Sequence, residues 1–248
     1  MNILVLVKQV PEIALIKVDA AANQVEYAIE EGLRIKEKSG GKCVVMSVGT
    51  ERTESALRDC LALGVDDAFL LCDTKFDGSD QQALAKVLTA GIKKLGGIDL
   101  VLAGRQAIDS DASQVPGAVA AGLDWPQAMF VKKFESIGDG KAVVYRTTED
   151  GYDVVELTLP AVVSVIKEIN EPRLPSLKGK MAAKKKAITR WSAADLGIDG
   201  SGVGADPRTT RRGVTPPPPR PKGEIITGES PDEIADKLFQ KLRDNQVI

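Results

Sequence analysis

The sequence has 248 residues, of which 43% are hydrophobic and 27% charged, with a formal net charge of −2. These proportions are typical of a globular protein and exclude a largely disordered chain, and the near-zero net charge gives no electrostatic reason to expect nucleic acid or an anionic membrane as a partner. The chain contains no histidine, which excludes the commonest general base, the Ser-His-Asp triad and most zinc sites.

The first half of the chain alternates short apolar runs with amphipathic helical patterns. The apolar runs predict strands that are buried on both faces of a sheet, at 3–7, 42–48, 67–72 and 99–103. The helical patterns cover 26–38, 53–63 and a segment that runs from a cap at Ser79 or Asp80 to Leu95. This βαβαβαβ order predicts an α/β fold with a doubly wound, mostly parallel sheet.

The second half of the chain departs from this alternation at about Val131. Segments 142–146 and 153–159 flank the turn sequence Glu149-Asp150-Gly151, so they predict an antiparallel hairpin, and 161–166 predicts a further buried strand. Beyond Asn170 the stretches 171–186 and 200–221 are rich in Pro, Gly and Lys. They are predicted to be irregular, either extended or ordered by a partner.

One more helix is predicted near the C-terminal end. Ser230 is placed to cap it, Pro231 to start it and Glu233 to complete a capping box. The helix carries an apolar stripe formed by Ile234, Leu238 and Leu242. That stripe needs a covering surface, which either the chain's own core or a second chain would supply. We therefore predict two parts, an α/β domain at 1–186 and an extended C-terminal arm with its helix at 187–248.

The sequence has no segment typical of membrane insertion or secretion. Its longest apolar runs are too short to span a bilayer, and Met1 leads into the first of them with no basic leader or cleavage site. We therefore expect a cytoplasmic protein that is not integral to a membrane. The three cysteines are widely separated, which predicts buried structural thiols rather than a disulfide or a metal site: Cys43, Cys60 and Cys72.

Ligands of open α/β sheets bind at the carboxyl ends of the strands, near the point where the strand order reverses. Three loops follow such ends, at 8–12, 49–52 and 104–114. The third combines Asp, Ser and Gln side chains with the start of a helix, where backbone N–H groups suit a phosphate and the polar side chains suit ribose or adenine. The alternative is a polar loop whose Asp and Ser only cap the helix, since the chain has neither a Walker A nor a GxGxxG pattern. Asp109 and Asp111 have no obvious third ligand beside them, which argues against a metal site.

Two leucines stand out in the irregular 171–186 stretch. Leu174 and Leu177 lie in a Pro-flanked loop, and the lysines that follow, Lys178, Lys180 and 184–186, are interpreted as a solvated basic run. Exposed leucines on such a loop indicate an anchor for a partner protein. Leucines tucked back beneath the loop are an equally good interpretation, so the pattern alone leaves both open.

Four motifs occur in order along the chain: GRQAID at 104–109, DWPQ at 124–127, LPAVV at 159–163, and NEPR at 170–173 followed by KKK at 184–186. Together with the flanking VKQV at 7–10 and DLG at 195–197, they resemble the beta subunit of electron transfer flavoprotein over about three quarters of the chain. Several independent motifs at compatible spacing make this resemblance specific.

The resemblance implies an adenine-nucleotide α-hydrolase-like fold and a heterodimer whose alpha subunit carries the redox-active FAD. It implies an electron carrier subunit without catalytic side chains rather than an enzyme. AMP would occupy this chain in most members, and a second FAD in the electron-bifurcating branch. Electrons would come from acyl-CoA dehydrogenase-type donors, as in fatty acid beta-oxidation, and would pass to a downstream quinone oxidoreductase.

The resemblance also assigns residues. The nucleotide-binding positions would be Leu6, Ala22, Asn23, Gln24, Val25, Val48, Asp109, Ser110, Asp111, Ala112, Ser113, Gln114, Val115, Pro116, Gly117, Ala118, Val119 and Ala120. The segment 170–186 would be the family's recognition loop, in which Leu177 anchors in the dehydrogenase. Its neighbours in docking would be Leu174, Lys178, Lys180 and Met181. The proline-rich tether and the last helix would clasp the alpha subunit.

Three features depart from the family pattern. Segment 19–25, one wall of the family's pocket, is shortened, and Val115-Pro116-Gly117 replaces the usual Thr-Gly or Val-Gly-Pro. Thr147 stands where some members have a glutamate that assists partner binding. The DWPQ motif favours the AMP-binding branch over the bifurcating one. A free-standing adenine-nucleotide hydrolase would instead need a phosphate-gripping Gly/Ser loop after the first strand, which Lys8-Gln9-Val10-Pro11 does not provide.

Overall fold

The computed structural model describes residues 1–10, 24–204, 207–209, 218 and 222–248. The chain divides into two units, Met1–Thr210 and Arg211–Ile248. The first unit contains the whole sheet. In the second, the residues that the structure describes form one helix.

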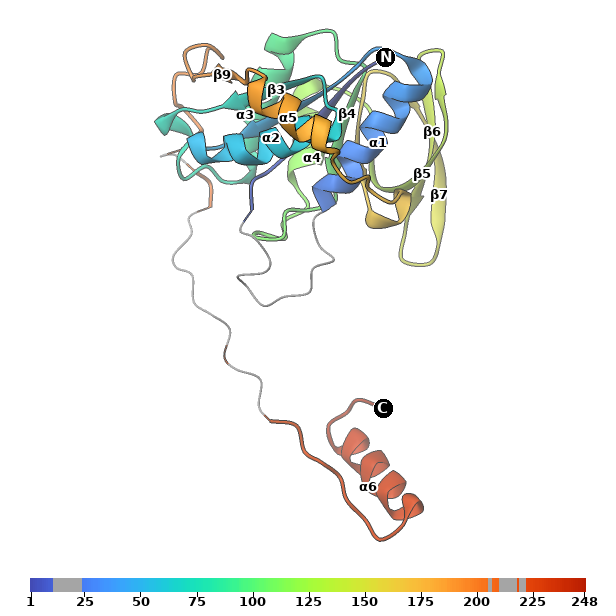
Figure 1. Cartoon of the computed structure of the whole chain (residues 1–248). Helices are drawn as coiled ribbons and strands as arrows, with labels where there is room; N and C mark the ends of the chain where they lie inside the picture. The colour runs from blue at the N-terminus through green and yellow to red at the C-terminus, as the bar shows by residue number, and fades with distance from the viewer. Residues whose placement is uncertain (11–23, 205–206, 210–217, 219–221) are drawn as a thin grey trace. The chain divides into compact units, whose positions relative to one another are not determined.

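The first unit is built on a nine-stranded sheet in the order β7-β6-β5-β8-β4-β1-β2-β3-β9. Figure 1 shows the hairpin strands β6 and β7 on one side of this unit and β9 on the other. Within this order, the six strands from β8 to β9 (β8, β4, β1, β2, β3 and β9) are parallel to one another, and β5 also pairs in parallel with β8. The hairpin partners β6 and β7 are antiparallel. The strands are β1 (Asn2–Leu6), β2 (Lys42–Val48), β3 (Asp67–Leu71), β4 (Leu100–Gly104), β5 (Gln127–Gly138), β6 (Lys141–Thr147), β7 (Tyr152–Thr158), β8 (Ala161–Val165) and β9 (Thr189–Trp191). The predicted α/β class, the mostly parallel sheet and the added hairpin are therefore confirmed.

Helices cover both faces of the sheet. Alternate residues of the central strands are therefore buried in two different hydrophobic clusters, one on each face. On β1, Ile3 and Val5 pack with α1 (Gln24–Ser39), α2 (Glu54–Leu63) and α5 (Leu177–Lys185), whereas Leu4 and Leu6 pack with α3 (Gln81–Leu95) and α4 (Val115–Leu123). Burial on both faces explains the continuous apolar run at this strand. None of the described helices is long and apolar enough to cross a membrane.

Local signals end and start these helices as the sequence predicts. Gly64 adopts a left-handed conformation with φ of 113° and ends α2, a conformation that glycine accepts without a steric penalty. Of the two predicted caps for α3, Asp80 takes the role, since its Oδ1 accepts a hydrogen bond of 2.9 Å from the backbone N of Ala83.

Four segments of the first unit differ from the sequence prediction. The prediction missed β5 and β9, and it treated 171–186 as irregular although residues 177–185 form α5. The stretch that begins at Gly200 was predicted to be extended or ordered by a partner. Among its described residues, however, Val203 is buried in the chain's own core and Gly204 N donates to Ser79 Oγ at 2.9 Å. Tertiary packing orders these segments, and a local pattern does not report such packing.

Two of the cysteines are buried, as predicted. Burial raises the pKa of the Cys43 and Cys60 thiols to about 12, so both stay protonated at neutral pH. Cys72 is only partly buried, and burial raises its pKa as well. All three thiols are free.

The second unit contains α6 (Pro231–Asp244), and its start confirms the predicted cap. Ser230 Oγ accepts a hydrogen bond of 3.2 Å from Glu233 N, and the Glu233 carboxylate accepts one of 2.7 Å from Glu229 N. Ile234 and Leu238 are exposed within the described residues, and so is Phe239. Of the proline run at 216–219, all but Pro218 lies outside the described residues.

Candidate functional site

The switch point of the sheet lies at β1. The chain passes from β1 to β2 on one side and reaches β4 on the other side, so the strand order reverses there. Leu6, the last residue of β1, pairs with Met46 of β2 and with Ala103 of β4. The loops after β1 and β4 therefore leave the same edge of the sheet on either side of the reversal, which is the usual ligand position in this architecture.

An ion pair joins these two loops. Lys8 Nζ, two residues after β1, lies 2.8 Å from each carboxylate oxygen of Asp109, which follows β4. Both side chains are partly exposed, so the pair contributes little to the free energy of unfolding, on the order of 0–1 kcal/mol. Its consequence is positional, because it fixes the spacing between the two loops of the switch point.

The rest of the β4–α4 loop is organised around Gln106. Its amide oxygen accepts a hydrogen bond of 2.8 Å from Ser113 Oγ, and its amide nitrogen donates to the carboxylate of Asp111. Asp111 and Ser113 both have positive φ angles, 49° and 50°. Non-glycine residues in this conformation concentrate at ligand sites, where the surrounding contacts hold them.

The loop ends at the start of α4. Gln114 occupies the N-cap position without a side-chain hydrogen bond to the helix, and Pro116 lies in the first turn. The first backbone N–H groups of a helix are unsatisfied within the helix and carry a partial positive charge, so this end suits a phosphate group. The hydroxyl, amide and carboxylate groups beside it suit ribose and adenine. The residues present therefore fit an adenine nucleotide.

The structure brings only part of the predicted nucleotide set to this edge. Residues 109–114 form the loop, Val48 lies at the end of β2, and Val115, Gly117 and Ala118 are half-buried in α4. The side chains of four predicted residues are instead buried in the protein: Leu6, Pro116, Val119 and Ala120. Ala22 and Asn23 lie outside the described residues, and so do the side chains of Gln24 and Val25, which begin α1.

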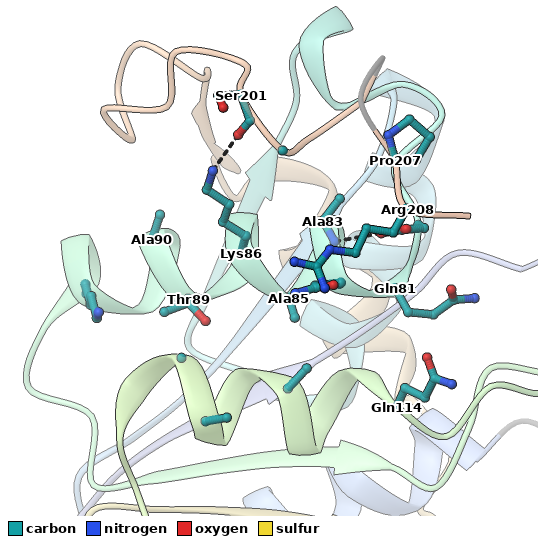
Figure 2. Close-up of a pocket in the computed structure, with 17 residues that line it drawn as sticks. Gln81, Ala83, Ala85, Lys86, Thr89, Ala90, Gln114, Ser201, Pro207 and Arg208 are labelled. Atoms are coloured by element: carbon teal, nitrogen blue, oxygen red, sulfur yellow. Dashed lines mark hydrogen bonds between the residues drawn. The ribbon is translucent and has the colours of Figure 1, made fainter. Parts of the chain in front are cut away.

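A cleft of about 1200 Å³ lies between α3, α4 and residues 201, 202, 207 and 208. Figure 2 shows Gln81 and Gln114 at neighbouring ends of the two helices, and Lys86 donating to the backbone oxygen of Ser201. Gln114 and Ala118 are the predicted nucleotide residues that line this cleft. The sequence analysis did not predict this cleft, and small residues on the facing helices are the signal that could have indicated it. A side chain at Gly122 would place its Cβ 2.7 Å from Thr89 Oγ1, so glycine permits the close approach of α4 to α3.

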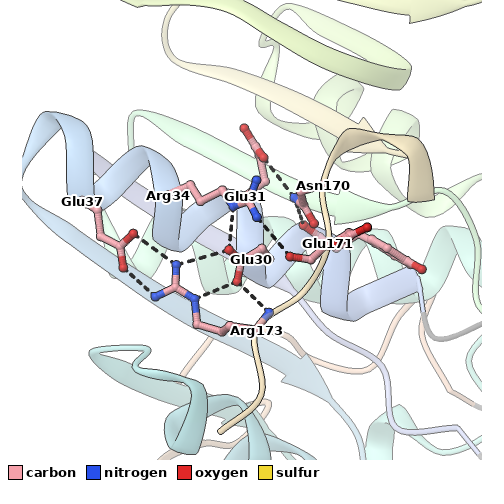
Figure 3. Close-up of polar contacts among 8 residues, drawn as sticks. Glu30, Glu31, Arg34, Glu37, Asn170, Glu171 and Arg173 are labelled. Atoms are coloured by element: carbon pink, nitrogen blue, oxygen red, sulfur yellow. Dashed lines mark hydrogen bonds and ion pairs between the residues drawn. The ribbon is translucent and has the colours of Figure 1, made fainter. Parts of the chain in front are cut away.

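The predicted recognition segment is anchored at its beginning on α1 (Figure 3). Asn170 Nδ2 donates to Tyr27 O at 3.0 Å and to the Glu31 carboxylate at 3.0 Å. Arg173 donates from Nε to Glu30 at 2.7 Å and from Nη1 to Glu37 at 2.6 Å. Residues 170–173 therefore form a base that is fixed to a core helix.

The same segment is anchored at its end on α2. Ser176 Oγ caps α5 by accepting a hydrogen bond of 3.0 Å from Gly179 N. An added Cβ at Gly179 would lie 2.3 Å from Ala62 O, which shows how closely α5 lies on α2. Arg58 donates to the last backbone oxygens of α5, with Ala183 O at 3.0 Å.

Between the two anchors the apolar side chains are exposed. Leu174 is 90% exposed, Leu177 78% and Met181 60%. The interpretation in which the leucines tuck under the loop is therefore wrong. Leu177 and Met181 stand four residues apart on α5, so they share one side of the helix, and Lys178 and Lys180 flank them.

The electrostatics of the base support its rigidity. Burial alone would raise the pKa of the Glu30 carboxyl, but hydrogen bonds from Arg173 and Arg34 hold it below its usual value. The Arg173 guanidinium likewise lowers the pKa of Glu37, and both carboxylates raise the pKa of Arg173. Glu31 responds in the opposite direction, since burial raises its pKa more than Asn170 lowers it.

Comparison with known proteins places these features in one family. The Electron transfer flavoprotein domain family matches residues 15–196. The chain is 39% identical over 264 residues to the caffeyl-CoA reductase-Etf complex subunit CarD of Acetobacterium woodii, and 40% identical over 263 residues to the electron transfer flavoprotein subunit beta of Thermoanaerobacterium thermosaccharolyticum, with 100% of both chains covered in each comparison. It is 37% identical over 267 residues to the subunit of the same name from Mycobacterium tuberculosis, covering 100% of this chain and 99% of that one. The chain therefore belongs to the electron transfer flavoprotein family, as one of its beta subunits and hence as an electron carrier subunit.

Proposed function

We propose that this chain binds AMP at the switch point and supports an FAD-bearing alpha subunit. The AMP phosphate would lie at the start of α4, with residues 109–114 around the ribose and adenine. The Lys8–Asp109 pair, with both distances at 2.8 Å, supports this placement because it joins the loops on either side of the strand reversal. Since no acid, base or nucleophile is assigned to this chain, AMP would stabilise the fold rather than react.

The chain would also hold the electron donor. Leu177 would insert into an apolar pocket of an acyl-CoA dehydrogenase-type partner, with Leu174 and Met181 beside it and Lys178 and Lys180 at the rim. One observation supports this role most strongly: three large apolar side chains are exposed on a segment whose two ends are anchored. Pre-ordering an exposed anchor lowers the entropy lost on docking, and a few such residues carry most of the affinity of an interface.

The C-terminal unit would clasp the alpha subunit, as the second part of a two-part chain. Ile234, Leu238 and Phe239 of α6 are exposed within the described residues. A helix with an apolar side and a charged side needs a partner surface to bury the apolar one. The FAD of the alpha subunit would supply the redox chemistry, taking electrons from the dehydrogenase during fatty acid beta-oxidation and passing them to a quinone oxidoreductase in a cytoplasmic setting.

A second candidate function is electron bifurcation, with an additional FAD in this chain in place of AMP. Both branches belong to the family that the chain matches, and one of its relatives, CarD, is by name a subunit of a caffeyl-CoA reductase-Etf complex. The DWPQ motif at 124–127 favours the AMP-binding function. The two candidates differ in the cofactor of this chain, which is AMP in the first and FAD in the second. One site could suit either cofactor, because FAD contains an AMP moiety in addition to its isoalloxazine ring.

Cofactor counting separates the two candidates. The chain is co-expressed with its alpha subunit, the heterodimer is denatured, and the released FAD and AMP are quantified by chromatography. One FAD and one AMP per heterodimer is the expected result. Two FAD molecules and no AMP would establish the bifurcating type, and a chain that does not co-purify with an alpha subunit would overturn both candidates.

A further inference from the structure

Glu30 is a carboxylate in an unusual position. It lies on α1 with its side chain 5% exposed, and it is one of only a few charged or polar residues buried in the part of the chain that the structure describes. Buried charges persist when they are paired and hydrogen-bonded, because an unpaired one loses its hydration without compensation. The hydrogen-bond partners of Glu30 therefore indicate the structural role of its buried carboxylate.

Those partners come mainly from residues 170–185, which we call the docking segment. Arg173 donates to Glu30 from its backbone N at 3.2 Å, from Nε at 2.7 Å and from Nη2 at 3.2 Å. Figure 3 shows the guanidinium of Arg173 between Glu30 and Glu37, so that the side chain is held from two sides. Such a fork restricts the direction of Arg173 and of the backbone that carries it.

A second arginine completes the arrangement. Arg34 donates from Nε to Glu30 at 2.6 Å and from Nη2 to the backbone oxygen of Glu171 at 3.0 Å. Glu30 thus orients two guanidinium groups. That of Arg34 holds the backbone oxygen of Glu171, and that of Arg173 ties residue 173 to α1, where the Arg173 backbone N also donates to Glu30. The next residue, Leu174, is 90% exposed. The constraint therefore ends one residue before the apolar surface begins.

We propose that Glu30 is a positioning residue for partner docking: acting through Arg173 and Arg34, it fixes the base that leads into the exposed Leu174 and on into α5, which carries Leu177. This inference rests on the proposed docking function. Glu30 itself would not touch the dehydrogenase, since its carboxylate faces its own chain. Its effect would be to keep residues 171–177 in their binding conformation before the partner arrives, so that less ordering is needed on contact.

Three variants of the heterodimer test this role. Glu30→Gln removes the buried charge, Arg173→Met removes the guanidinium and keeps the apolar stem, and Glu168→Gln is the matched control on an exposed residue just before the segment. Arg173 is partly exposed, which makes Arg173→Met the safeguard if Glu30→Gln does not fold. Leu177→Ala, which removes the proposed anchor itself, serves as the reference.

Two readouts are measured on each variant. Hydrogen exchange of the amides at 171–177 is followed in the heterodimer without any partner, and affinity is measured by interferometry on an immobilised short-chain acyl-CoA dehydrogenase. We expect Glu30→Gln and Arg173→Met to speed exchange at 171–177 by at least tenfold and to weaken binding about tenfold, with FAD content unchanged. Glu168→Gln should change neither readout.

The outcomes separate the two proposals. If Leu177→Ala weakens binding but Glu30→Gln and Arg173→Met leave affinity unchanged, the positioning role is overturned while docking through Leu177 stands, even if exchange becomes faster. If Leu177→Ala also leaves affinity unchanged, the docking function fails and takes the positioning role with it. Faster exchange together with weaker binding in both base variants supports the inference.

Discussion

The docking segment and the nucleotide loop are held in opposite ways. Residues 170–185 are fixed at both ends by a buried carboxylate, a helix cap and a close helix contact, and their apolar side chains are nevertheless exposed. The β4–α4 loop is joined to β1 by one partly exposed ion pair and contains two residues with positive φ. The first arrangement is complete without a ligand, whereas the second has backbone donors at α4 that a ligand would satisfy.

This difference predicts which region depends on its ligand. The docking segment should keep its conformation in the absence of a partner, because its contacts are internal. The nucleotide loop should gain order when AMP binds, because ligand contacts would add to a single surface ion pair. Four experiments test this contrast, beginning with the largest expected change in stability.

The contact between α5 and α2 should be the most sensitive point. Gly179→Ala would place a Cβ 2.3 Å from the backbone oxygen of Ala62, which has no flexible end to move away. The gain in helix propensity, about 1 kcal/mol, is smaller than the clash, so we expect a net loss of about 1–3 kcal/mol in the free energy of unfolding. Urea unfolding of the heterodimer measures it. Gly151→Ala is the control, since nothing lies within 4 Å of an added Cβ there; equal stability of the two variants would contradict the close contact.

Acid should weaken the ion pairs of the base at residues 170–173. The folded-state pKa values of Glu30 and Glu37 lie below their usual values, so these groups stabilise the fold above an unfolded pKa of about 4.3, and the contribution is lost as pH falls through the folded values. Glu31 acts with the opposite sign, since its raised pKa makes its charged form a cost at neutral pH. We expect Glu30→Gln to flatten the decline in stability as the pH falls below about 5. Parallel declines for variant and parent would exclude Glu30 as a contributor.

The ion pair of the nucleotide loop should matter less for stability than for the ligand. Asp109→Asn removes a partly exposed pair, so the free energy of unfolding without nucleotide should change by less than about 1 kcal/mol. Retention of AMP should fall, because the loops after β1 and β4 are no longer joined. Calorimetric titration of AMP into the nucleotide-free heterodimer measures this affinity. Asp139→Asn, in the turn between β5 and β6, is the control. Unchanged affinity would remove Asp109 from the proposed site.

The sequence predicted the central sheet because its strands are buried on both faces. For such a strand a continuous apolar run is sufficient to predict its position. The predicted and observed bounds of β2 agree. The same argument fails for β9, whose three residues are held by pairing with β3 rather than by their own pattern.

The candidate sites were predictable to different degrees. The β4–α4 loop follows from strand order alone, but the burial of Val119 and Ala120 does not, because one face of α4 turns to the core. In the docking segment α5 was missed. Its core contacts are Ala183 and a glycine against α2, which leave almost no apolar period in the sequence. The local signal that could have predicted this helix is a capping residue, Ser176, followed by the helix-favouring residues Lys, Met and Ala.

The kinetics of flavin reduction test the central claim most directly. The heterodimer is reduced by an acyl-CoA dehydrogenase and its substrate in stopped flow, with Leu177→Ala compared with Val154→Ala, which truncates an exposed apolar side chain on β7. We predict that Leu177→Ala lowers kcat/KM of the dehydrogenase, with the heterodimer as the varied electron acceptor, by about 10- to 30-fold. A buried interface anchor contributes about 2 kcal/mol, which corresponds to such a factor. The value of kcat at saturating heterodimer should stay unchanged. Val154→Ala should retain the parent kcat/KM. An unchanged kcat/KM in Leu177→Ala would contradict docking through this segment.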